Sequence, residues 1–347
     1  MAKMASNHKY QLRSKKSKLT TTIAITAPKQ EPNPPGEKAS QKSHISILNP
    51  DTLIEIFSYL PTKALGRAAR VCQHWRTYAY SKQLWKDVEF TWKRKCSEAM
   101  THSLLTRGIQ RIRIKPSTNL SLNLCLHTFP RLESLTVIIP VGFKTSSPLF
   151  PKEKCNFSSL RELHVETECS PKGPKSISKV TLDIFEAFFP NVEVVYLHYM
   201  YLRDATFNFL GQWERLREVT LIGLIPGMFI SRPTPGRPRV LESMTLEGIN
   251  DFNAATMEAI VNSFPNLRSM QLEVYVDSAS AFDPHSCLEH LKKLKKVKTV
   301  ILSVYMKRVP EDQCKVPEAV AKYRNETGVD LVVQLRPTPS PVSIACY

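Results

Sequence analysis

The sequence predicts an α/β protein, in which three N-terminal helices precede a solenoid with parallel strands on its concave face and helices on its convex face. Two observations carry this fold class. Apolar residues recur at helical spacing between prolines in residues 44–90, and a six-residue pattern typical of a short strand recurs eight times between residues 109 and 302. With 42% apolar and 23% charged residues, the 347-residue chain can bury a sizeable core.

Residues 1–43 are rich in Ser, Thr, Lys and Pro and predict a disordered basic tail. They hold nine Lys or Arg and two Glu, a net charge of +7, so 17 − 7 = +10 remains for the rest of the chain. The surplus makes nucleic acids, acidic membranes and acidic proteins candidate partners. One basic run in this tail fits a nuclear import signal and consists of Arg13, Lys15, Lys16 and Lys18. The alternative interpretation is a run of solvated charges.

No stretch of 18 apolar residues predicts a membrane helix, and no hydrophobic segment follows the basic start. We therefore expect a soluble protein of the cytoplasm and/or the nucleus. The eight cysteines are widely scattered, and in a reducing compartment we expect them to be free thiols.

Residues 44–90 predict three short helices. Asn49 can cap the first helix with Pro50 at its first position, and Pro61 ends it. Thr62 can cap the second helix, which we expect to continue through Trp75, and the third helix contains Leu84 and Trp85. So small a bundle cannot bury all of its large apolar side chains, so an exposed hydrophobic patch that binds a partner is expected.

The same segment resembles an F-box. Leu48 to Pro61 matches the opening pattern of that family, and Val71-Cys72-x-x-Trp75 and Leu84-Trp85 match its later landmarks. Asn49 stands where the family has its first proline. An ordinary three-helix core fragment is the alternative interpretation.

The F-box resemblance implies docking on a Skp family adaptor and, through it, association with cullin and RING subunits. The residues that it implies for adaptor binding are Leu48, Pro50, Ile56, Phe57, Leu60, Leu65, Val71, Cys72, Trp75, Leu84 and Trp85. On this basis, aspartate at Phe57 or Leu60 is expected to abolish adaptor capture and to leave the rest of the chain folded.

The recurring unit has the form L-x-x-L-x-L, and its copies start at intervals of 23 to 32 residues. A large aromatic residue usually lies three positions before the unit, as Phe129, Phe157, Phe189, Trp213 and Phe264 do. The pattern resembles irregular leucine-rich repeats. The Asn or Cys that this family often places after the unit is missing, and those positions hold Pro140, Glu168, Met200, Leu224 and Ile249.

The connecting segments complete the predicted organisation. Helices are expected at 181–190, 253–265 and 317–328, loops at 140–154, 169–175 and 225–238, and a final strand at 329–335. The predicted domains are the tail at 1–43, the F-box at 44–90, the irregular leucine-rich-repeat solenoid with its C-terminal cap at 91–335, and a flexible tail at 336–347.

Alternate strand residues should form a ladder on the concave face, which begins with Arg111, Arg113 and Lys115. Beyond this rung the ladder holds five Glu and no Lys or Arg, which makes nucleic acid an unexpected partner and favours a protein substrate. The alternative interpretation is that these five glutamates only keep the sheet soluble. The predicted substrate-binding residues are Glu162, His164, Glu166, Tyr196, His198, Glu218, Thr220, Thr245, Glu247, Gln271 and Glu273.

No motif for phosphate binding, zinc proteolysis or a nucleophilic serine occurs in the chain. The pairs Cys287/His290 and Cys125/His127 lack a second pair at ligand spacing. We therefore expect no enzyme activity, no metal and no cofactor. The basic run on the helix before the last unit is expected to be a solvated face; it consists of Lys292, Lys293, Lys295, Lys296 and Lys298.

Together, these features imply the substrate-recognition subunit of an SCF-type cullin-RING ubiquitin ligase. In that role the F-box binds the adaptor and the repeats bind an unknown protein substrate. Two alternatives stay open: a repeat scaffold that binds partners without promoting ubiquitination, and a nucleic-acid-associated protein that uses the basic tail and Lys292 to Lys298.

Overall fold

The computed structural model divides the chain between Ile47 and Leu48, and the residues that it describes all belong to the unit that begins at Leu48. They are 48–92, 97–116, 119–140, 157–168, 189–198, 213–226, 240–276, 283–306 and 315–337. The predicted basic tail, most of the predicted helix at 181–190 and nearly all of the predicted loops lie outside them.

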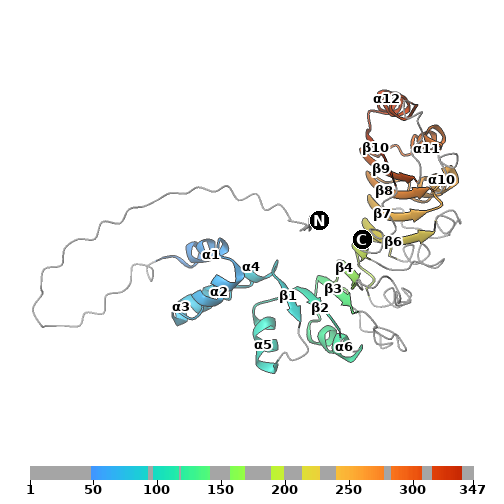
Figure 1. Ribbon diagram of the computed structural model, residues 1–347. Coiled ribbons are helices and arrows are strands. Elements are labelled where there is room, and N and C mark those ends of the chain that lie inside the picture. Colours follow the sequence, from blue (N-terminus) through green and yellow to red (C-terminus); the bar gives the residue numbers. More distant parts are fainter. Residues whose placement is uncertain are drawn as a thin grey trace, which may run out of the picture. The chain divides into compact units, whose positions relative to one another are not determined.

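The N-terminal part of this unit is helical (Figure 1), with four helices instead of the three predicted. The predicted second helix is split because Cys72 has extended backbone angles, φ −156° and ψ 170°, and its Sγ accepts a hydrogen bond from the Trp75 N–H. The helices are α1 (Pro50–Ser58), α2 (Thr62–Ala68), α3 (Gln73–Ala79) and α4 (Lys82–Trp85).

These helices pack around several of their own large apolar side chains. The ring of Phe57, which is only 2% exposed, packs edge-on against Trp75 with 5.4 Å between the ring centroids. Leu65 and Trp85 are also buried, and the Trp85 indole donates a hydrogen bond to the Ala79 carbonyl. The small bundle therefore uses its largest apolar side chains to hold itself together.

A ten-stranded sheet follows, and every strand pairs in parallel with the next one in the chain (Figure 1). The predicted units all form strands. The first strand, β1, was not predicted. It begins after a connection of three residues that follows α4, and it precedes the first repeat. The strands are β1 (Glu89–Trp92), β2 (Arg111–Ile114), β3 (Ser134–Ile139), β4 (Glu162–Thr167), β5 (Val194–His198), β6 (Glu218–Pro226), β7 (Ser243–Asn250), β8 (Ser269–Val276), β9 (Thr299–Met306) and β10 (Asp330–Pro337).

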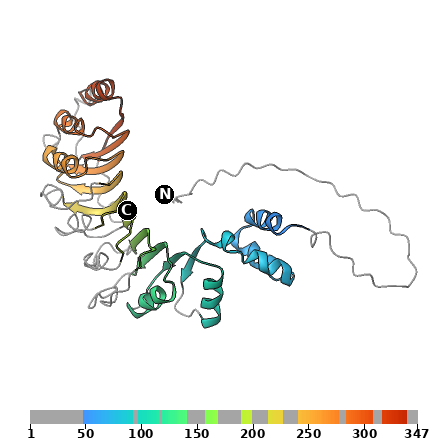
Figure 2. The same cartoon turned by 180° about the vertical axis from the view of Figure 1, so that it is seen from behind.

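Helices alternate with the strands where the connections are described. They are α5 (Glu98–Thr106), α6 (Asn119–Thr128), α10 (Ala254–Ser263), α11 (Pro284–Leu291) and α12 (Lys315–Thr327). Figure 2 shows α10, α11 and α12 side by side along one face of the sheet. The helices predicted at 253–265 and 317–328 are thus confirmed, and the final strand runs two residues past Leu335 into the predicted tail.

The core of the sheet follows the six-residue pattern. Its apolar positions are buried, and the aromatic residues three positions earlier, such as Phe129 and Phe264, are buried as well. Each of these aromatics accepts a backbone hydrogen bond from the first residue of its unit, as in Leu132 N–H to Phe129 O at 3.2 Å. The repeated turn brings the chain into the next strand in the same register.

The helical bundle contacts the start of the sheet region through Arg107, the residue that caps the C-terminus of α5. Its guanidinium lies 3.9 Å from the centroid of the Tyr80 ring and 4.5 Å from that of Trp85. Gly108 follows with φ +69°, beside the aliphatic part of Lys82. Because these contacts join α4 to α5, the bundle and the first repeat share one apolar core.

Candidate functional site

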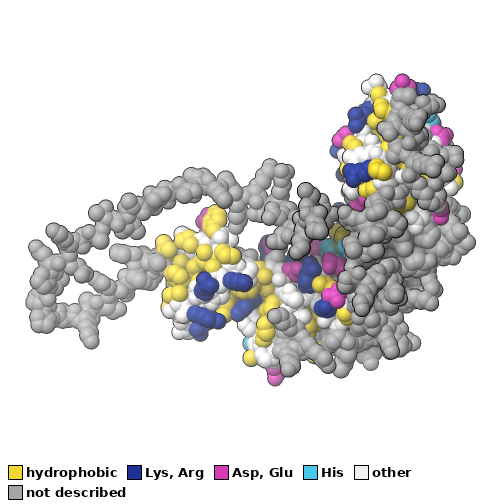
Figure 3. Space-filling model, viewed as in Figure 1, with side chains coloured by type: hydrophobic (Ala, Val, Ile, Leu, Met, Phe, Trp, Pro, Cys, Tyr) yellow, Lys and Arg dark blue, Asp and Glu magenta, His cyan; other side chains and the backbone are white. Residues whose placement is uncertain are grey.

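The first candidate site is an exposed apolar patch on the helical bundle, formed by Ile56, Tyr59 and Val71. These side chains are 45%, 67% and 64% exposed, respectively. Figure 3 shows hydrophobic side chains gathered over α1 to α3, with Lys and Arg side chains beside them. A hydrophobic surface of this kind on a small bundle is typical of a protein-binding site.

The residues implied for adaptor binding do not all lie on this patch. Phe57, Leu65 and Trp85 are buried in the core of the bundle, and their role in adaptor binding stays a prediction. Half-buried side chains that pack on this core are those of Leu48, Leu60, Trp75 and Leu84. Only Pro50, Ile56, Val71 and Cys72 of the predicted set are exposed. Tyr59 was missed, although it caps the C-terminus of α1, three residues after Ile56.

The second candidate site is the sheet face that carries the alternate residues of β2 to β9, most of them partly exposed, which we call the ladder face. The strand registers place equivalent residues of the predicted ladder opposite one another, as in Arg111, Ser134 and Glu162. All of the predicted substrate-binding residues lie on this face, and most are half-buried. Their role in binding stays a prediction.

The beginning of the ladder face is neutralised internally. Arg111 reaches past the small Ser134 and donates to both carboxylate oxygens of Glu162, at 2.9 and 3.2 Å. Arg113 lies between Glu89 and Glu166, with N···O distances of 2.9 and 3.7 Å. The acidic residues of this part of the ladder are therefore already paired with basic residues of the first rung.

Aromatic rings occupy the middle of the ladder face. The centroid of Tyr196 lies 5.6 Å from that of His164 and 5.7 Å from that of His198. Burial lowers the pKa of His198 to about 4. Burial also lowers the pKa of His164, although the neighbouring Glu162 and Glu166 oppose that shift.

The low pKa of His198 predicts that the protein loses stability in mild acid. In the unfolded chain this histidine binds a proton near pH 6.5, whereas in the folded chain it stays unprotonated until about pH 4. The free energy of unfolding should therefore decrease as the pH is lowered through this window. Urea unfolding at several pH values across this window measures the loss. The His198→Gln variant should show a smaller loss than the wild type.

The end of the ladder face, over β7 to β9, has a different character. Glu247 and Glu273 lie opposite each other on neighbouring strands. Burial and the charge of Glu273 raise the pKa of Glu247. Beside them the Tyr275 and Tyr305 rings are stacked, with centroids 5.0 Å apart. Both tyrosines were missed, although the alternation of apolar and polar residues continues past the six-residue unit and would have found them.

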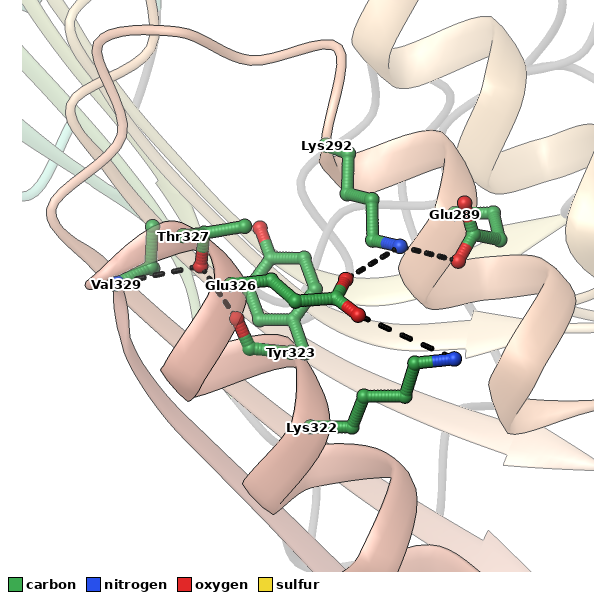
Figure 4. Close-up of polar contacts among 7 residues, drawn as sticks. All are labelled: Glu289, Lys292, Lys322, Tyr323, Glu326, Thr327 and Val329. Carbon is green, nitrogen blue, oxygen red and sulfur yellow. Dashed lines mark hydrogen bonds and ion pairs between the residues drawn. The ribbon is translucent and has the colours of Figure 1, made fainter.

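The basic run before β9 is not a helix face, because α11 ends at Leu291. Figure 4 shows Lys292 between Glu289 and Glu326, with N···O distances of 2.5 and 2.8 Å. Hydrogen bonds to these carboxylates raise the pKa of Lys292, and the same contact lowers the pKa of Glu326. Lys293 pairs with Glu258 on α10, so part of the run joins successive repeats.

Within the described ranges, no group of three His, Cys, Asp or Glu side chains is arranged to hold a metal ion. Burial raises the pKa of the Cys287 thiol to about 12, which keeps it protonated and unreactive. The helices of the described segments are all too short or too polar to cross a membrane.

Comparison with known proteins identifies a family model and a curated relative that are similar to part of this chain. The family model described as F-box-like matches residues 50–91. F-box/LRR-repeat protein 12 from Bos taurus is 41% identical over 56 residues, which make up 16% of this chain and 17% of the relative. The match thus spans about a sixth of the length of that relative. Residues 50–91 form an F-box-like domain.

Proposed function

We propose that the chain is the substrate-recognition subunit of an SCF-type cullin-RING ubiquitin ligase. The observation that carries this proposal is the F-box-like domain at residues 50–91, which exposes Ile56 on α1 and Val71 between α2 and α3. Full burial of one such side chain contributes about 1.5 to 3 kcal/mol, so a few of them can support stable binding to an adaptor.

The parallel sheet serves, in this proposal, as a set of leucine-rich repeats that binds the target protein on the ladder face. The similarity to a protein named for both an F-box and LRR repeats supports this assignment, together with the recurring unit that forms each strand from β2 to β9. The chain itself need not be an enzyme or hold a cofactor, because a receptor raises the rate of transfer by holding the target close to the conjugating enzyme. It acts in the cytoplasm, the nucleus or both.

The adaptor interaction is tested by placing a charge in the apolar patch. The double variant Ile56→Asp/Val71→Asp should lose at least about a hundredfold in affinity for the purified adaptor, because two exposed apolar contacts are replaced by carboxylates that must be desolvated. Its thermal midpoint should stay close to that of the wild type, since both side chains are exposed in the free chain.

A matched control is available on α5, where Leu105 is 44% exposed but lies outside the F-box-like domain. Leu105→Asp should bind the adaptor as tightly as the wild type. If the double variant also retained full affinity, the adaptor-binding role of this patch would be refuted. If the adaptor bound but no ubiquitin reached any associated protein, the scaffold alternative would be favoured.

A further inference from the structure

The ladder face over β7 to β9 is acidic and lacks the internal ion pairs found at its beginning. Glu247 and Glu273 are opposite each other in the strand register, where like charges destabilise a sheet. Each carboxylate accepts a hydrogen bond from a neutral group: Gln271 donates to Glu247 at 3.4 Å and the Tyr275 hydroxyl donates to Glu273 at 3.0 Å. In the described part of the chain, neither carboxylate forms an ion pair.

The acidic residues of β4 lie on the same sheet face but are paired differently. Glu162 and Glu166 each form an ion pair with an arginine of β2. The strands that border β7 and β8 offer no such cation in the corresponding row, which holds Ile222 on one side and Ser303 on the other. Burial, and to a smaller extent the charge of Glu273, raise the pKa of Glu247, and a positive charge from another molecule would offset both effects.

The stacked tyrosines make the same area suitable for arginine. Tyr275 and Tyr305 lie one row beyond the glutamates, are half-buried and are nearly parallel, with 17° between the ring planes. A guanidinium can pair with a carboxylate through two hydrogen bonds and also stack on an aromatic ring, and it is less strongly hydrated than an ammonium group. The nearest basic residue by register, Arg336, contacts Tyr305 and Gln334 instead of the glutamates.

We propose that the ladder face over β7 to β9 binds an extended protein segment that carries arginine side chains at alternate positions. The carboxylates of Glu247 and Glu273 bind the guanidinium groups, and the Tyr275–Tyr305 stack covers one of them. The proposal deepens the proposed function, since the segment belongs to the target. A phosphate backbone is repelled by this surface, so a protein segment is the fitting partner.

The test uses the full chain and two labelled peptides, Gly-Ser-Ala-Arg-Ala-Arg-Ala-Ser-Gly and the same peptide with citrulline for arginine. Citrulline keeps the shape of arginine and removes its charge. At about 150 mM salt, fluorescence anisotropy should show saturable binding of the arginine peptide and at least about tenfold weaker binding of the citrulline peptide. Because the chain has a net charge of +17, non-specific attraction does not explain capture of a cation.

Substitutions on the ladder face test where the arginine peptide binds. Glu273→Gln should weaken binding of the arginine peptide about tenfold, and Tyr305→Leu should weaken it several-fold. Glu162→Gln is the matched control and should change affinity less than about twofold, since Arg111 already uses that carboxylate. Absence of saturable binding, equal binding of the two peptides, or equal losses from Glu273→Gln and Glu162→Gln would each overturn the proposal.

Adaptor capture is measured on the same samples and reports separately on the proposed function. Loss of peptide binding in Glu273→Gln with full adaptor capture is the expected result. A wild-type chain that binds the arginine peptide but ignores the adaptor would refute the ligase role and leave the arginine-binding face in place. A chain that captures the adaptor but not the peptide would refute the arginine-binding face and leave the ligase role in place.

Discussion

Replacing Phe57 with aspartate is expected to unfold the F-box-like domain and not merely to remove a docking contact. The ring is 2% exposed and packs edge-on against Trp75. Loss of a buried Phe costs about 3 to 5 kcal/mol, and burial of an unpaired carboxylate adds to that cost. We expect a total loss above about 4 kcal/mol, a large part of the stability of a small domain. Limited proteolysis and circular dichroism will measure it.

The neighbouring variant Ile56→Asp separates a core role from a surface role. Ile56 precedes Phe57 on α1 but is 45% exposed, so its replacement should leave protease resistance close to that of the wild type. Both variants should lose adaptor binding, for different reasons. A folded Phe57→Asp domain that only fails to bind the adaptor would restore Phe57 as a contact residue and contradict the buried position of its ring.

The helical part of the fold was predictable from local rules, and its surface was not. The Asn49 cap, Pro50 at the first helical position and the apolar spacing in α1 all agree with the structure. Periodicity identifies the apolar stripe of a helix, but the stripe of α1 is shared between the internal core, which takes Phe57, and the exposed patch, which keeps Ile56. That division depends on how α3 and α4 pack, which no local pattern records.

The strands were predictable because the six-residue unit repeats, and stacking of parallel strands brings equal positions into register. The start of the sheet was harder to predict because it lies outside this pattern. β1 has a single four-residue segment, Glu89–Trp92, with no copy of the unit, so its Glu89 contact with Arg113 was missed. The pairing of Glu162 with Arg111 spans two strands and 51 positions in the sequence, and only the assembled sheet reveals it.

Gly248→Ala is expected to destabilise the sheet by about 2 to 5 kcal/mol, the sum of a backbone penalty and a steric clash. Gly248 has φ +93°, a backbone region that costs an alanine about 1 to 2 kcal/mol. A Cβ at this position would lie 2.0 Å from the carbonyl oxygen of Gly223 on β6, where the registers of β6 and β7 shift. The backbone must move to relieve the clash, at a further cost of about 1 to 3 kcal/mol. Urea unfolding of the full chain will measure the sum.

Gly328→Ala provides the control that isolates the clash. Gly328 follows α12 with φ +69°, so alanine there meets the same kind of backbone penalty, but no atom lies within 4 Å of the added Cβ. The loss in Gly328→Ala should therefore be smaller by the cost of the backbone shift. Equal losses in the two variants would show that the strands near Gly223 relax freely, and the bulge between β6 and β7 would then not depend on a glycine at position 248.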